Sequence, residues 1–82
     1  MVIVMNNNEF DLYEAIAANI KKYRKEANIT QAELSERVGV SHEFIRRIES
    51  KKGTKTFSVD TLYKISLALE IDIKELFDFG NK

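Results

Sequence analysis

The chain has 82 residues, enough for one domain, and its 44% hydrophobic and 32% charged residues are typical of a sequence that builds a folded core. It contains no Cys and a single His, which excludes a disulfide framework, a thiol nucleophile and a Cys-based zinc site. No apolar stretch approaches the roughly 20 residues that a membrane span needs, and the start does not resemble a signal peptide. We therefore expect a cytoplasmic protein without a membrane anchor.

The net charge is zero, but the charges are distributed unevenly along the chain. Residues 1–20 carry three acidic and no basic residues, residues 21–55 carry ten basic and five acidic residues, and residues 56–82 carry three basic and five acidic residues. A basic centre between acidic ends can attract a polyanion to one face of a neutral protein. On charge alone, a solvated basic surface explains the same pattern equally well.

The first structural element that the sequence predicts is a long helix. Its apolar residues recur at spacings of three and four, which places them on one helix face: Leu12, Ile16, Ile20 and Tyr23. We expect this helix over about residues 9–27, with Asn28 as a left-handed stop.

The domain boundaries follow from this first helix. Residues 1–8 are interpreted as a loose N-terminal extension, residues 9–79 as one domain and residues 80–82 as a tail. A strand-like arm that pairs across a dimer is the alternative for the extension.

Four later segments share the pattern of a helix start. In each, a Ser, Thr or Asp that can cap the helix follows an apolar residue, and a second apolar residue occupies the fourth position of the helix. The four caps are Thr30, Ser41, Ser58 and Asp72. The first and the last cap are each followed three residues later by a Glu, as in a capping box. Together these starts predict helices over 31–38, 42–50, 59–69 and 73–78, so the expected fold is all-α with five helices.

The connection between the second and third of these helices is short. Gly39 supplies the positive φ that ends a helix at little cost, and only residues 39–41 separate the helices. A three-residue connection forces two helices to cross steeply, as in a helix-turn-helix. An ordinary helical corner is the alternative.

The helix expected over residues 42–50 has a polar face opposite an apolar face. At about 100° per residue, Ile45 and Ile48 fall together on the apolar face, where they can anchor the helix to a core. The side chains that then project outward are His42, Glu43, Arg46 and Arg47. Arg can bind guanine through two hydrogen bonds, Glu can accept from cytosine, and His can donate to guanine. We therefore expect these four residues to contact DNA bases.

Each of these side chains also has a second interpretation. Glu43 can simply favour the helix N-terminus by its charge, Arg46 can bind phosphate or pair within the chain, and His42 can be a plain exposed residue. Phe44 belongs either to the core or to a contact with a thymine methyl group. The loop that follows is either solvated or suited to phosphate contacts, through Lys51, Lys52, Thr54 and Lys55.

These residues resemble a known family. The run from Ile29 to Glu49, ITQAELSERVGVSHEFIRRIE, is similar to the helix-turn-helix of the lambda repressor-like regulators (Cro and phage-repressor type, XRE family). The similarity continues through residues 62–69 and ends at residues 75–77, so it covers roughly residues 12–77. The resemblance implies a five-helix DNA-binding domain that binds palindromic operators as a homodimer.

The resemblance also implies roles for individual residues. Gln31 matches a glutamine that touches a phosphate at a helix N-terminus, and we expect Ser41, at the next helix start, to contact phosphate as well. Arg24 and Glu49 match an ion pair that links the first helix to the end of the third. Residues 50–53 depart from the family pattern, because Ser-Lys-Lys-Gly replaces the Asn-Gly of many relatives.

We therefore predict a sequence-specific transcriptional regulator, expected to be a repressor, that binds a palindromic operator in the major groove of double-stranded DNA as a homodimer. No metal or cofactor is expected. Exposed apolar residues often mark a partner surface, and for the dimer we expect Leu76, Phe77 and Phe79. The alternative is a protein-binding antitoxin or anti-regulator of the same fold. An enzyme is not expected. The chain has one His, no Cys and no glycine-rich phosphate loop, so the sequence offers no recognisable set of catalytic residues.

Overall fold

The computed structural model describes residues 11–50 and 57–80, and in this part of the chain it contains helices and no strand. In chain order the elements are α1 (Leu12–Glu26), α2 (Gln31–Val38), α3 (His42–Glu49), α4 (Val59–Leu69) and the 3-10 helix η1 (Ile73–Phe77). The prediction of an all-helical domain is confirmed. The count of five α-helices is wrong by one, because the last segment is a five-residue 3-10 helix. None of the described helices has the length and hydropathy of a membrane span.

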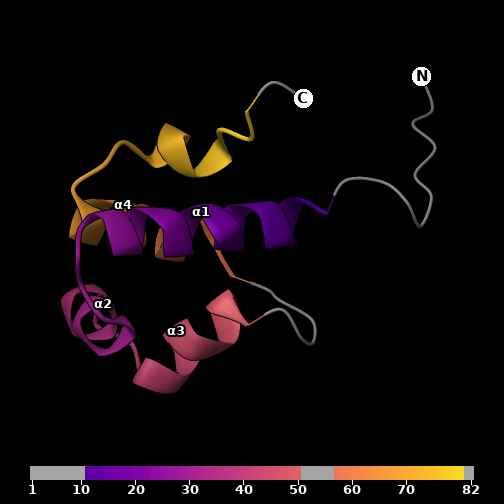
Figure 1. Ribbon diagram of the computed structural model, residues 1–82. Helices are drawn as coiled ribbons and strands as arrows, with labels where there is room; N and C mark the ends of the chain where they lie inside the picture. The colour runs from indigo at the N-terminus through magenta and orange to yellow at the C-terminus, as the bar shows by residue number, and fades with distance from the viewer. Residues whose placement is uncertain (1–10, 51–56, 81–82) are drawn as a thin grey trace.

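The long helix α1 lies at the centre of the molecule. Figure 1 shows α2 and α3 on one side of it and the C-terminal segment on the other, with α4 crossing behind. The helix begins at Leu12, three residues later than predicted, because the Asp11 side chain accepts the amide of Glu14 and acts as the N-cap. It ends at Glu26, and Asn28 has the left-handed conformation expected of a stop, with φ of 62°.

The local signals for the later helix starts are confirmed. Each expected cap accepts a backbone amide with its side-chain oxygen: Thr30, Ser41, Ser58 and Asp72. The capping box of Thr30 and Glu33 is complete. The box expected at Asp72 is wrong, because Asp72 accepts the amide of Lys74 rather than that of Glu75.

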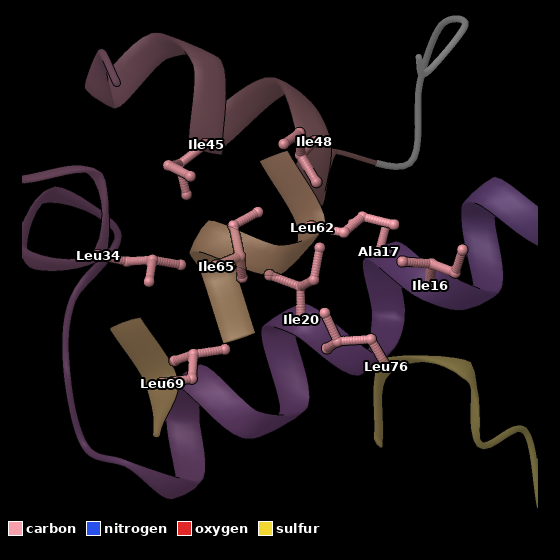
Figure 2. Packing of buried hydrophobic residues seen from close by; sticks show 10 residues of the cluster. All are labelled: Ile16, Ala17, Ile20, Leu34, Ile45, Ile48, Leu62, Ile65, Leu69 and Leu76. Atoms are coloured by element: carbon pink, nitrogen blue, oxygen red, sulfur yellow. The ribbon is translucent and has the colours of Figure 1, made fainter. Parts of the chain in front are cut away.

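One apolar core joins all five elements. Figure 2 shows its members converging from every helix: Ile16, Ala17, Ile20, Leu34, Ile45, Ile48, Leu62, Ile65, Leu69 and Leu76. Ile45 and Ile48, the two residues by which α3 was expected to be anchored, are 0% and 3% exposed. Burying a side chain of this size stabilises the fold by about 1.5–3 kcal/mol, so α3 is held by its apolar face.

The C-terminal segment is attached to α1 by polar contacts as well as by the core. The Asn19 side-chain amide donates to the carbonyl oxygens of Leu76 (2.9 Å) and Asp78 (3.0 Å). The Tyr23 hydroxyl donates to the Glu75 carboxylate at 3.1 Å. Desolvation of Tyr23, together with this hydrogen bond to Glu75, raises the pKa of the phenol above its ordinary value. Glu75 thus binds α1 instead of completing a capping box.

The prediction that Leu76, Phe77 and Phe79 form a dimer surface has to be corrected. Leu76 is 0% exposed and belongs to the core, so it is not available to a second chain in this fold. Phe79 is half-buried and packs against the core, whereas Phe77 is 41% exposed. The C-terminal apolar residues therefore serve mainly to close the domain.

The contrast between Leu76 and Phe77 predicts a difference in stability. Leu76→Ala should lower the free energy of unfolding by about 2–5 kcal/mol, because it leaves a cavity in the core. Phe77→Ala, the control at the neighbouring exposed position, should lower it by less than about 1 kcal/mol. Urea denaturation followed by circular dichroism measures both. Equal losses in the two variants would contradict the assignment of Leu76 to the core.

Candidate nucleic-acid interface

The turn between α2 and α3 is built from local interactions. Gly39 ends α2 with φ of 87°, and its amide donates to the carbonyl of Ser35 at 2.8 Å. Ser41 then starts α3 by accepting the amide of Phe44 at 3.0 Å. Figure 1 shows α2 nearly end-on and α3 lying across the view, so the two helices cross steeply, as the short connection requires.

The two faces of α3 differ sharply in exposure. Ile45, Ile48 and Glu49 are buried, whereas the four side chains that were expected to read bases are all exposed: His42, Glu43, Arg46 and Arg47. None of the four belongs to the hydrophobic core cluster. We call these four residues the outer face of α3.

A buried ion pair fixes the end of α3 against α1. Arg24 donates from Nε to Oε2 of Glu49 at 2.7 Å and from Nη2 to Oε1 at 2.9 Å. Arg24 also donates from Nη1 to the carbonyl of Ile29 at 2.8 Å. The Arg24 and Glu49 side chains are only 9% and 2% exposed. Because both oxygens of Glu49 are bonded, this pair fixes direction as well as distance.

Gln31 connects the ion pair to the outer face of α3. Its Nε2 donates to Oε1 of Glu49 at 3.0 Å, and its Oε1 lies 3.4 Å from Nε2 of His42. Since a side-chain amide carries two N–H donors, one donor of Gln31 remains for another acceptor. This contact of Gln31 with Glu49 was not expected from the sequence, because the residues lie on different helices and nothing in their spacing indicates it.

The charged residues of the outer face interact weakly within the chain. Arg46 forms an ion pair with Glu43, which is the intrachain alternative considered for Arg46. Both side chains are more than 60% exposed, and an exposed pair of this kind contributes about 0–1 kcal/mol. The Arg47 guanidinium carbon lies 5.9 Å from the ring centre of the half-buried Phe44. A competing ligand can therefore replace these contacts at little cost.

The basic loop that was expected to contact phosphates falls largely outside the described residues. This applies to Lys51, Lys52, Thr54 and Lys55. Within the described part of the chain, the expected phosphate contacts Gln31 and Ser41 lie at the first turns of α2 and α3. Their backbone amides give each helix start a partial positive charge.

The buried ion pair generates a stability prediction. Glu49→Ala should lower the free energy of unfolding by about 3–5 kcal/mol, because it leaves the Arg24 charge buried without its carboxylate. Glu43→Ala removes a carboxylate from the same helix at an exposed site and should cost less than about 1 kcal/mol. Thermal and urea unfolding of the two variants measure the difference. A loss in Glu49→Ala as small as that in Glu43→Ala would show that the pair does not hold α3.

Comparison with known proteins places this arrangement among helix-turn-helix proteins. A family model described as "Helix-turn-helix" matches residues 20–76. The transcriptional regulator SinR of Bacillus subtilis is 35% identical over 63 residues, which cover 77% of this chain and 56% of SinR. The CTXphi phage repressor RstR of Vibrio cholerae is 38% identical over 61 residues, which cover 74% of this chain and 53% of RstR. The chain thus spans about half the length of these two relatives.

Solved structures agree with the sequence comparison. The crystal structure of SinR in complex with DNA superposes with a TM-score of 0.68 and 35% identity, and the match covers 77% of this chain and 98% of that one. The matched proteins named above are transcriptional regulators, not enzymes.

Proposed function

Because the chain belongs to the lambda repressor-like helix-turn-helix family, we propose that it is a sequence-specific transcriptional regulator that inserts α3 into the major groove of double-stranded DNA. The observation that supports this proposal is the orientation of α3. Its Ile45 and Ile48 are buried and its Glu49 is bound by Arg24, so only the charged side of the helix faces outward. A helix held in this way fits the width of the major groove.

Base recognition is proposed for the outer face of α3. Arg47 can donate two hydrogen bonds to guanine, Glu43 can accept from the amino group of cytosine, and His42 can bond to a base or a phosphate. Arg46 leaves its exposed pair with Glu43 to bind a base edge. Such hydrogen bonds to base edges would distinguish one DNA sequence from another.

Phosphate contacts are proposed for a second set of residues that surrounds the outer face. Gln31 keeps one amide donor for a phosphate while the other binds Glu49. Ser41 lies at the adjacent helix start, and the basic loop residues follow α3 in the sequence. Such contacts set the affinity and the position of the protein on DNA but carry no sequence information directly.

The regulator is proposed to act as a repressor on a palindromic operator, as a homodimer. Two copies related by a two-fold axis would present their α3 helices to successive major grooves about 34 Å apart. The operator would then have two half-sites with that spacing. The proposed site of action is the cytoplasm of a prokaryotic cell, where the DNA lies.

The proposal predicts the effect of removing Arg47. Arg47→Ala should weaken binding to the cognate site by about 1–3 kcal/mol and relax the preference at one base position in each half-site. Arg37→Ala is the matched control, because Arg37 is an exposed arginine whose guanidinium donates to the carbonyl of Ala68, away from α3. Selection of bound sequences from random DNA, followed by fluorescence anisotropy, measures both variants. If the wild-type protein selects no sequence, the regulator function is rejected and the protein-binding alternative takes its place.

A separate prediction concerns Lys52, whose role is proposed from the sequence. Lys52→Ala should weaken binding to all DNA sequences alike and reduce the slope of log affinity against log salt concentration by about one. Titrations at several salt concentrations, on cognate and random duplexes, measure this slope. A loss confined to the cognate duplex would instead assign Lys52 to base recognition.

A further inference from the structure

Helix α4 has an apolar face that is exposed in the described part of the chain. Val59, Tyr63 and Leu67 are 71%, 51% and 57% exposed. They are spaced by four residues and so lie on one side of the helix. The adjacent face of the same helix supplies Leu62, Ile65 and Leu69 to the core, and these are at most 6% exposed. We call the three exposed residues the α4 stripe.

Three large apolar residues in one exposed row are unusual on the surface of a small monomeric domain and typically mark a contact site. The C-terminal segment does not offer a comparable row, because Leu76 is buried and Phe79 packs against the core. Among the described residues of this segment, Phe77 is the exposed large apolar residue. The described surface therefore favours α4 over the C-terminus as the place where another protein docks.

We propose that the occupant of the α4 stripe is α4 of a second copy of this chain, packed antiparallel about a two-fold axis that passes beside Tyr63. In this arrangement Tyr63 meets its own counterpart. Val59 and Leu67 lie four residues to either side of Tyr63, about 6 Å along the helix axis, so each Val59 faces Leu67 of the second copy. The stripe is thus complementary to itself, as a two-fold interface requires.

The charges beside the stripe support a second copy as the occupant. Lys64 lies 3.2 Å from Asp60 within one chain, and both side chains are more than half exposed. Asp60 lies about 4.5 Å before Tyr63 along the axis and Lys64 about 1.5 Å after it. Because the two helices run in opposite directions, Asp60 of one copy and Lys64 of the other are separated by only about 3 Å along the helix axes. The two-fold axis keeps these residues on the same side of the paired helices, in the order Asp60, Lys64, Lys64, Asp60 along the axis. Each Lys64 then lies about 3 Å along the axis from Asp60 of the other copy and about 3 Å from the other Lys64, so two attractive contacts oppose one repulsive contact.

This inference rests on the proposed function only in that the regulator acts as a homodimer. It is tested on the full chain without DNA, by light scattering coupled to size-exclusion chromatography. Wild-type protein should be a dimer, and Tyr63→Glu should be a monomer, because two carboxylates would then meet at the two-fold axis. Phe77→Glu introduces the same charge at the exposed C-terminal position and should leave the dimer intact. Circular dichroism checks that both variants are folded.

Charge reversal gives a second test that does not depend on apolar contacts. Asp60→Lys and Lys64→Glu each place like charges across the proposed interface, so each variant alone should dissociate more readily than wild type. Mixed in equal amounts, they should form a heterodimer, because the first variant then has two lysines facing two carboxylates of the second. The ion pair within each chain stays broken in the mixture, so recovery can come only from contacts between chains.

Three results would overturn the α4 interface: a monomeric wild-type chain at its highest soluble concentration, a dimer that Phe77→Glu disrupts and Tyr63→Glu does not, or no heterodimer in the mixture. DNA selection by the wild-type chain tests the proposed function separately. A chain that selects a DNA sequence but dimerises elsewhere would retain the regulator function and lose the α4 interface.

Discussion

The orientation of α3 depends on the buried ion pair between Arg24 and Glu49. The apolar contacts of Ile45 and Ile48 attract α3 to the core but are not directional, so they alone would tolerate a shift or rotation of the helix. Two charge-assisted hydrogen bonds between Arg24 and Glu49 have strict geometry. Burying these charges is costly unless they remain paired, and this cost confines α3 to one position relative to α1.

The same constraint separates the residues that support α3 from those that can bind a ligand. Both carboxylate oxygens of Glu49 are bound, by Arg24 and Gln31, whereas Glu43 pairs with Arg46 at the exposed surface. Buried contacts are therefore rigid and exposed contacts are exchangeable. Gln31 lies at the boundary, since it binds Glu49 with one end of its amide and faces His42 with the other. A change at this residue would affect both sets of contacts.

Helix α4 illustrates how a small domain can use one element twice. Its buried side completes the core with Leu62, Ile65 and Leu69, and its outer side leaves the α4 stripe uncovered. An 82-residue chain buries a limited fraction of its surface, and in this structure the second apolar face of α4 stays exposed. The C-terminal segment does not provide that cover within the chain, because η1 is held against α1 by Asn19 and Tyr23.

The sequence by itself determined the features that arise from residues a few positions apart. Thr30 and Gly39 set the two ends of α2, and Ser41 sets the start of α3, through contacts within four residues. Helices α2 and α4 have the predicted bounds. Only the tertiary structure decided which apolar faces are buried. Helical spacing places Leu76 and Tyr63 each on an apolar face, but packing against α1 buries the first and leaves the second exposed. The partners of Gln31 and Glu75 were decided in the same way, because hydrogen bonds between distant helices depend on how those helices pack, which local spacing does not encode.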